Sequence, residues 1–234
     1  MLTHSKKNLS LIALTMILTA CGGGSGSGAQ SSPVPPATVT SIIPYGVVAS
    51  GSAQALSIKG TNFVNGMTVS VDGINFPATV TSSTVITANV TITTVPTNNV
   101  ANVAVKSLSG ATLGTVTLGV ASAAITLAAD VYPILDAKCR SCHTGAANGN
   151  LDFATYATTA SASATGLIGI PSSGCPSKFR VAVGDPRRTS SVFIDKISVS
   201  GTPCSGTLMP PTGSPALTTT EIQTIVDWVA GGAN

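Results

Sequence analysis

Short runs of alternating apolar and polar residues fill the chain from about residue 37 to 121. Thr68-Val69-Ser70-Val71 and Val103-Ala104-Val105 alternate in this way, and Asp72-Gly73 and Ser109-Gly110 provide turn dipeptides. Alternation with period two places the apolar side chains on one face of a strand, and the turns favour antiparallel pairing. About 85 residues suffice for a domain with its own core. The pattern therefore predicts an all-β sandwich over 37–121.

The periodicity becomes helical from about residue 127 to the end. Asp130 is predicted to cap a helix that leads into Cys139, with Pro133 in its first turn. A second helix starts at the capping box formed by Thr218 and Glu221 and stops at Gly231-Gly232. Its apolar face is Ile222, Ile225, Val226 and Val229. These helices predict an all-α C-terminal domain over 127–234.

The pentapeptide Cys139-Arg140-Ser141-Cys142-His143 carries the clearest candidate chemistry. In C-x-x-C-H motifs the two thiols form thioethers with a haem, and the histidine ligates its iron. The motif therefore predicts one covalent haem c held by Cys139, Cys142 and His143.

Two other interpretations of this motif stay open. A redox-active C-x-x-C pair is one, although the βαβ pattern that it requires is missing from this stretch. A zinc site is the other, with Cys175 and Cys204 as the remaining ligands.

Only two methionines and one histidine remain after removal of a leader peptide. His4, Met1 and Met16 lie in that leader, which leaves His143 with Met67 and Met209. Met209 precedes two prolines, which hold the backbone extended. Met209 is therefore predicted as the second iron ligand, with packing in the core as the alternative.

The first twenty residues are typical of a secretory signal peptide. Lys6 and Lys7 precede the apolar run 9–18, which is too short for a membrane span. The sequence Leu18-Thr19-Ala20-Cys21 resembles the lipobox of bacterial lipoproteins, which implies lipidation of Cys21 and anchoring to a membrane. An ordinary signal peptide is the alternative. Since Gly22 stands where such lipoproteins often carry an inner-membrane retention aspartate, we expect the outer membrane, facing the periplasm or the cell surface.

Residues 21–36 are rich in Gly, Ser and Pro and are predicted to be a flexible linker. Cys175 and Cys204 are the two cysteines without another assignment. In an oxidising compartment they predict a disulfide, with free buried thiols as the alternative.

Charge excludes one class of function. The chain has 11 basic and 8 acidic residues, and two lysines leave with the signal peptide, so the mature charge is 9 − 8 = +1. Nucleic-acid binding would need a strongly basic face, and none is predicted.

Residues 37–121 resemble the IPT/TIG immunoglobulin-like family. The matching landmarks are Ile42-Ile43-Pro44-Tyr45-Gly46, the run Ala55–Phe63 with its Gly-Thr-Asn-Phe element, and the strand before Asp72-Gly73. The resemblance implies an immunoglobulin-like sandwich, which in exported proteins serves as a spacer or an interaction module.

Residues 127–234 resemble bacterial cytochrome c domains of the planctomycete type. The C-x-x-C-H motif, the segment 181–186, Leu208-Met209-Pro210-Pro211 and the closing helix carry this resemblance. It implies a cytochrome c fold. Because a guanidinium suits a carboxylate, haem propionates are predicted to contact one of three arginines, Arg180, Arg187 or Arg188, with solvated surface charge as the alternative.

Together these features predict a membrane-anchored monohaem cytochrome that passes single electrons between redox partner proteins and is not an enzyme. One alternative is a haem enzyme or gas sensor with an open distal site. The other is a surface adhesion or assembly protein that acts through its immunoglobulin-like domain.

Overall fold

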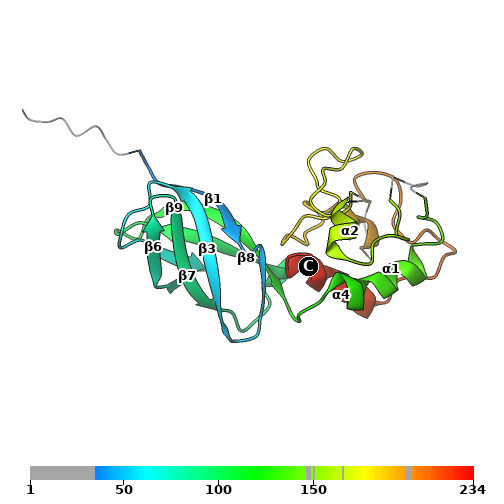
Figure 1. Cartoon of the computed structure of the whole chain (residues 1–234), viewed down its shortest axis with the longest axis horizontal. Coiled ribbons are helices and arrows are strands. Elements are labelled where there is room, and N and C mark those ends of the chain that lie inside the picture. The colour runs from blue at the N-terminus through cyan, green and yellow to red at the C-terminus, as the bar shows by residue number, and fades with distance from the viewer. Residues whose placement is uncertain (1–34, 146–148, 150, 165, 199–201) are drawn as a thin grey trace, which may run out of the picture. The chain divides into compact units, whose positions relative to one another are not determined.

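The computed structural model describes residues 35–145, 149, 151–164, 166–198 and 202–234 (Figure 1). The predicted signal peptide, Cys21 and the linker up to Val34 lie outside these residues. The compact unit that the structure describes begins at Pro35 and ends at Asn234.

Two β-sheets form the first part of this unit, and Figure 1 shows the strands that build them. One sheet has four strands in the order β1-β3-β7-β6, and the other has five in the order β2-β9-β8-β4-β5. The strands are β1 (Thr38–Ile43), β2 (Gly46–Val48), β3 (Ala53–Thr61), β4 (Thr68–Val71), β5 (Ile74–Phe76), β6 (Ala78–Ser82), β7 (Val85–Thr91), β8 (Val100–Lys106) and β9 (Thr112–Ala121), with a 3-10 turn, η1, over Thr97–Asn99.

The alternating runs set the register of the antiparallel pairs. In the β3–β7 pair Leu56 lies opposite Ala88, and Ile58 lies opposite Ile86. Leu56, Ile58 and Ile86 are at most 1% exposed, because period-two alternation turns all three toward the core between the sheets. β2 is parallel to β9, so the sheets are not purely antiparallel.

Four short α-helices and a π-turn account for the regular structure after residue 126. They are η2 (Leu127–Val131), α1 (Tyr132–Lys138), α2 (Thr159–Ala164), α3 (Val192–Ile197) and α4 (Thr219–Ala230). The α-helices have 7, 6, 6 and 12 residues. The described regular structure is thus mainly β-sheet.

The predicted all-α cytochrome c fold is therefore wrong. Glycines recur between α1 and α4, and Gly169, Gly184 and Gly206 have φ angles of 70°, 71° and 62°. This left-handed conformation ends helices rather than extending them. Most of the region consequently consists of loops that are held by side chains.

The two predicted helix starts differ in outcome. Thr126, not Asp130, caps η2: its Oγ1 accepts from the Ala129 amide at 3.3 Å, while Asp130 Oδ2 accepts from the Thr126 amide at 2.8 Å. At α4 the capping box is present, with the Glu221 amide donating to Thr218 Oγ1 at 3.1 Å and the Thr218 amide donating to Glu221 Oε2 at 2.7 Å.

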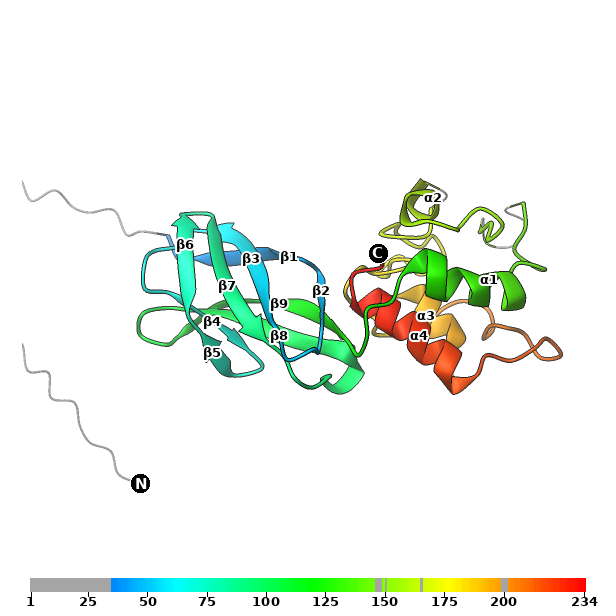
Figure 2. The same cartoon turned by 60° about the horizontal axis from the view of Figure 1, so that its bottom comes forward.

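A second apolar core includes residues of η2, α1, α3 and α4. Figure 2 shows that α1, α3 and α4 lie in the same part of the chain's fold. Leu135 of α1 and Trp228 of α4 have no exposed surface. Other fully or almost fully buried members are Leu127, Val131, Phe153, Tyr156, Leu167, Val181, Ile225 and Val229. This core fixes the loops between the helices, although no long helix covers them.

Asp227 of α4 joins the helix to the ends of η1 and β9. It is 3% exposed. Its Oδ1 accepts from Asn99 Nδ2 and from the Ser122 amide, both at 3.0 Å, and its Oδ2 accepts from the Ser122 hydroxyl. The carboxylate is thus buried with three donors, as a buried charge requires.

Two glycines permit the close approach of α4 to the sheet. A Cβ at Gly46 would lie 1.9 Å from the carbonyl oxygen of Ala230, and a Cβ at Gly119 would lie 2.1 Å from the same oxygen. Larger residues at Gly46 and Gly119 would therefore separate these elements.

Among the described residues, the helices are too short or too polar for any to cross a membrane. The domain bounds 37–121 and 127–234 stay predictions, although each range contains its own apolar cluster.

Candidate binding pocket

One pocket of about 510 Å³ lies beside α1 and α3. Its wall comes from α1 and the turn after it, from Gly149, Leu151 and Phe153, from the segment 172–175, from α3, and from the segment 205–214. Its lining comprises Lys138, Cys139, Cys142, His143, Gly149, Leu151, Phe153, Leu167, Ser172, Ser173, Gly174, Cys175, Arg180, Val192, Phe193, Lys196, Ile197, Ser205, Met209, Pro210, Pro211 and Ser214. Apolar surface predominates in this lining.

The structure brings the four predicted cofactor residues, Cys139, Cys142, His143 and Met209, to this pocket. Cys139 is the residue that ends α1, and its amide donates to the Leu135 carbonyl at 2.9 Å. The His143 amide continues this turn by donating to the Cys139 carbonyl at 3.0 Å. The short turn therefore places both thiols and the imidazole along one side of the pocket.

Phe153 holds the His143 ring in place. The ring centroids lie 5.3 Å apart with an interplanar angle of 68°, and the Phe153 amide donates to the His143 carbonyl at 2.8 Å. Tyr156 packs edge-on against the other side of Phe153, with centroids 5.1 Å apart. These contacts are the T-shaped arrangement that aromatic rings prefer.

Burial, followed by smaller effects of the nearby Cys142 and Glu221, raises the pKa of the Cys139 thiol to about 11. A thiol with this pKa is protonated near neutral pH, whereas reactive C-x-x-C thiols have lowered pKa values. The structure therefore gives no support to the interpretation as a redox-active pair.

Met209 lines the pocket from the segment that follows the disulfide. Its amide donates to the Lys196 carbonyl at 2.7 Å, and the peptide bond to Pro210 is cis. The contact with α3 thus fixes the backbone at the point where the Met209 side chain meets the pocket.

Three cations line the pocket, and among its described lining residues none is acidic. Lys138 Nζ forms an ion pair with Glu221 Oε1 at 3.7 Å. Arg180 donates to the carbonyl oxygens of Gly166 and Gly149 at 2.9 and 3.2 Å. Lys196 Nζ donates to the carbonyl oxygens of Ser205 and Thr207. Since Glu221 is the single carboxylate among these partners, the three cations give the pocket a net positive lining.

Of the three arginines predicted to contact propionates, only Arg180 lines the pocket. Arg187 donates to both carboxylate oxygens of Asp185, from Nε to Oδ1 at 2.7 Å and from Nη2 to Oδ2 at 2.6 Å. Burial raises the pKa of Asp185, but hydrogen bonds, including that from Arg187, outweigh burial and hold this pKa below its usual value. Arg188 donates to Asp195 at 2.9 Å. Arg187 and Arg188 therefore serve ion pairs within the chain.

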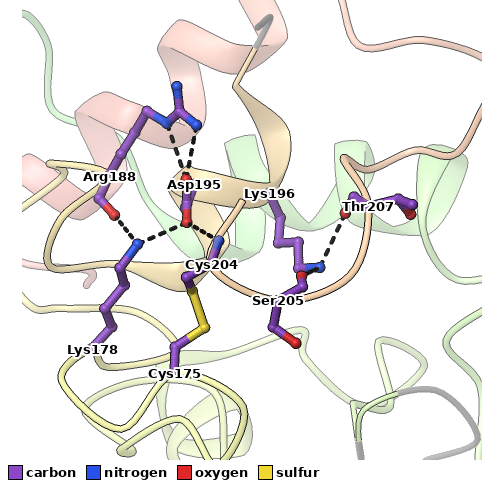
Figure 3. Close-up of a disulfide and its surroundings, with 8 residues drawn as sticks. All are labelled: Cys175, Lys178, Arg188, Asp195, Lys196, Cys204, Ser205 and Thr207. Carbon is purple, nitrogen blue, oxygen red and sulfur yellow. Dashed lines mark hydrogen bonds and ion pairs between the residues drawn. A yellow bond between two sulfur atoms is a disulfide. The ribbon is translucent and has the colours of Figure 1, made fainter. Parts of the chain in front are cut away.

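Cys175 and Cys204 form a disulfide, with Cα atoms 6.1 Å apart (Figure 3). The zinc interpretation needed both thiols as ligands, and the disulfide removes them. Cys175 lines the pocket and is 5% exposed. The disulfide thus ties the pocket segment 172–175 to the segment that carries Met209.

The predictions of a covalent haem c and of a cytochrome are wrong. Among the residues that the structure describes, no three His, Cys, Asp or Glu side chains form a group that could hold a metal ion. The helical frame that the cytochrome prediction required is also missing, since the pocket wall is largely made of loops. The redox partner proteins were inferred from that prediction and have no separate support.

Comparisons with known proteins do not establish a family. No family model and no curated protein matches the chain, so the resemblances to IPT/TIG domains and to cytochrome c are not supported. Auxiliary nutrient binding proteins from Bacteroides ovatus ATCC 8483 and Bacteroides thetaiotaomicron VPI-5482 match 37% of this chain at 13% and 12% identity. Both have a TM-score of 0.27, and the chain spans about a fifth (20%) of each.

A third structure, provisionally described as a phosphatase from Bacteroides thetaiotaomicron VPI-5482, has 19% identity and a TM-score of 0.25 over 37% of this chain and 17% of that one. Such low TM-scores carry no argument about fold or function. The descriptions also do not decide between a binding protein and an enzyme.

Sequence reasoning missed several residues that shape the pocket. Lys138, Lys196 and Phe193 line it, and Phe153 supports His143, but no motif marks them. Phe193 and Ile197 lie four residues apart on one face of α3, and this spacing was the available indication. The cations carried no signal, because surface lysines are common in any sequence.

Proposed function

We propose that this chain is an exported binding protein whose pocket holds a mostly apolar ligand with an acidic group. The observation that carries the proposal is the composition of the lining: apolar surface, three cations and, among the described lining residues, no carboxylate. The volume of about 510 Å³ lies within the usual range of small-molecule sites.

Lys196 indicates which chemical group of a ligand the pocket would bind. Its described hydrogen-bond partners are neutral carbonyl oxygens, so no carboxylate of the described chain neutralises it. An acidic ligand group would form a charge-assisted hydrogen bond there, which is stronger than a neutral one. The apolar side chains Phe153, Phe193 and Ile197 would cover the rest of the ligand.

A pair of ligands that differ in one group tests this proposal. Anilinonaphthalene sulfonate is an aromatic anion whose fluorescence reports binding in an apolar site. We expect the full chain to bind this probe and dodecanoate to displace it, with dodecanol at least about tenfold weaker because it lacks the charge. Equal displacement by the acid and the alcohol would remove the acidic-ligand claim, and no binding of any of the three would remove the pocket function.

Export and lipidation at Cys21 belong to the same proposal. A lipid there would place the pocket at a membrane surface, in the outer membrane facing the periplasm or the cell surface, without nucleic-acid partners and without catalysis. The β-sandwich would separate the anchor from the pocket. Cys21→Ser should move the chain from the membrane fraction to the soluble fraction, and persistence in the membrane fraction would contradict lipid anchoring.

A further inference from the structure

We infer that the disulfide Cys175–Cys204 is a redox-sensitive clamp on the pocket, so that its reduction releases the ligand. This inference rests on the proposed function. It starts from the position of the bond, which joins two segments of one pocket wall that lie 29 residues apart in the chain.

The segment 204–209 is attached mainly to two adjacent residues of α3 (Figure 3). The Cys204 amide donates to Asp195 Oδ2 at 3.0 Å. Lys196 Nζ donates to the Ser205 carbonyl and, at 3.0 Å, to the Thr207 carbonyl. The Met209 amide donates to the Lys196 carbonyl at 2.7 Å. The wall is therefore a loop held at its base, without a helix or a strand of its own.

Asp195 is fixed independently of the disulfide. It is 3% exposed and accepts from Lys178 Nζ at 2.7 Å and from Arg188 NH2 at 2.9 Å. These cations hold the carboxylate in place on α3 when the sulfur bond is absent. Reduction should therefore loosen the loop and leave α3 folded.

The disulfide is the covalent tie from this loop to the pocket segment 172–175. Ser205 lies against Gly174, where an added Cβ would be 3.1 Å from Ser205 Oγ. Cys204 is exposed, whereas Cys175 is buried. An external thiolate can thus reach the Cys204 sulfur, which is the requirement for thiol–disulfide exchange.

The chemical step is a two-electron exchange with a dithiol. One thiolate of the dithiol attacks the Cys204 sulfur, the bond between the two protein sulfurs breaks, and Cys175 takes a proton as it leaves. The second thiol of the dithiol then displaces Cys204. The products are two protein thiols and the oxidised, cyclic dithiol.

Binding of anilinonaphthalene sulfonate to the full chain, with and without dithiothreitol, tests the clamp. We expect the reduced chain to bind the probe roughly tenfold more weakly, about the loss of one charged hydrogen bond. A Cys175→Ser/Cys204→Ser variant should bind weakly in both conditions. As a matched control, Asp136→Ala, which changes an exposed ion pair on α1, should keep the response to dithiothreitol.

Amide hydrogen exchange separates a clamp from a general loss of structure. Reduction should speed exchange at the Cys204 and Met209 amides and leave strands β3, β7 and β8 unchanged. Faster exchange throughout the chain, or unchanged probe affinity on reduction, would overturn the clamp. If the oxidised chain binds no probe at all, the proposed pocket function fails instead.

Discussion

Lys196 has two roles in this account, because its ammonium group lines the pocket and also holds the loop that forms the wall. Its bonds to the Ser205 and Thr207 carbonyls fix the loop, and its charge faces a lining without described acidic residues. A substitution therefore affects any ligand through the wall and an acidic ligand through the charge as well.

Lys196→Met separates these effects when two ligands are compared. We predict that dodecanoate loses about tenfold more affinity than dodecanol, because only the acid loses a charge-assisted contact. Displacement of anilinonaphthalene sulfonate measures both. Lys106→Met, which removes a cation bonded to Thr112 on the sandwich, is the control and should change neither affinity. Equal losses for both ligands in Lys196→Met would limit Lys196 to holding the loop.

Asp195 should make the stability of the folded chain depend on pH. Burial raises its pKa, but hydrogen bonds from Lys178, the Cys204 amide and Arg188 outweigh this, and the pKa lies below its ordinary value. The unfolded value is about 3.9. A lowered folded pKa adds stability that is present above that value and is lost as the pH falls through the folded pKa.

Asp195→Asn should remove that pH-dependent part. We expect the free energy of unfolding of the variant, measured in urea, to fall less steeply between about pH 4 and pH 2 than that of the wild type. Asp136→Asn, in an exposed ion pair, is the matched control. Parallel pH curves for wild type and Asp195→Asn would show that the ion pairs of Asp195 do not affect stability.

The sequence indicated some pocket residues and not others for a physical reason. Cys139, Cys142, His143 and Met209 stand in recognisable local patterns, and the structure places all four at the pocket. Lys196 acquires its role only from the loop that folds back on α3. Arg187 and Arg188 were candidates for ligand contacts, but nearby aspartates pair with them.

At the level of elements, α4 shows how much local sequence can determine. Its first turn is fixed by Thr218 and Glu221, whose reciprocal bonds are visible in the sequence because they span three residues. Thr218→Ala should lower the free energy of unfolding by about 1 kcal/mol, as loss of an N-cap does. Thr220→Ala, at an exposed position of the same helix, should change it less. If Thr218→Ala leaves the free energy of unfolding in urea unchanged, packing alone holds α4.

The contact between α4 and the sandwich depends on long-range pairing that no local pattern reveals. Asp227→Ala would leave the buried Asn99 without one of its acceptors and would remove the carboxylate that ties Ser122 to α4. We predict a loss of about 3 kcal/mol in urea unfolding. Asp136→Ala should cost less than about 1 kcal/mol, since its ion pair with Arg140 is exposed. Similar losses for both variants would mean that the Asp227 contacts contribute little.

The strands were easier to predict than the helices. The alternating run 68–71 coincides with β4, and the run 103–105 is part of β8. The all-α prediction for 127–234 was wrong because two good helical segments were extended to the whole region. The loops between them are held by the disulfide, the Asp195–Lys178 ion pair and the contact of Phe153 with Phe193, which bring together residues far apart in the sequence.

The chain joins a sandwich with its own core to a loop-rich region that lines the pocket. Gly46 and Gly119 allow α4 to approach the sheet closely, so this helix of the pocket region packs tightly against the sandwich. The wall formed by residues 204–209 is held by a few contacts and one disulfide. This combination suits a protein that retains a ligand and releases it when the wall loosens.

Mass spectrometry of the full chain, purified from the cells that naturally produce it, tests the central claim most directly. The account predicts an additional mass under native conditions that disappears on denaturation and belongs to an acidic, mostly apolar molecule. A chain that carries no added mass at the pocket would contradict ligand binding. A porphyrin still attached to Cys139 and Cys142 after denaturation would contradict the account and re-establish the covalent haem predicted from the C-x-x-C-H motif.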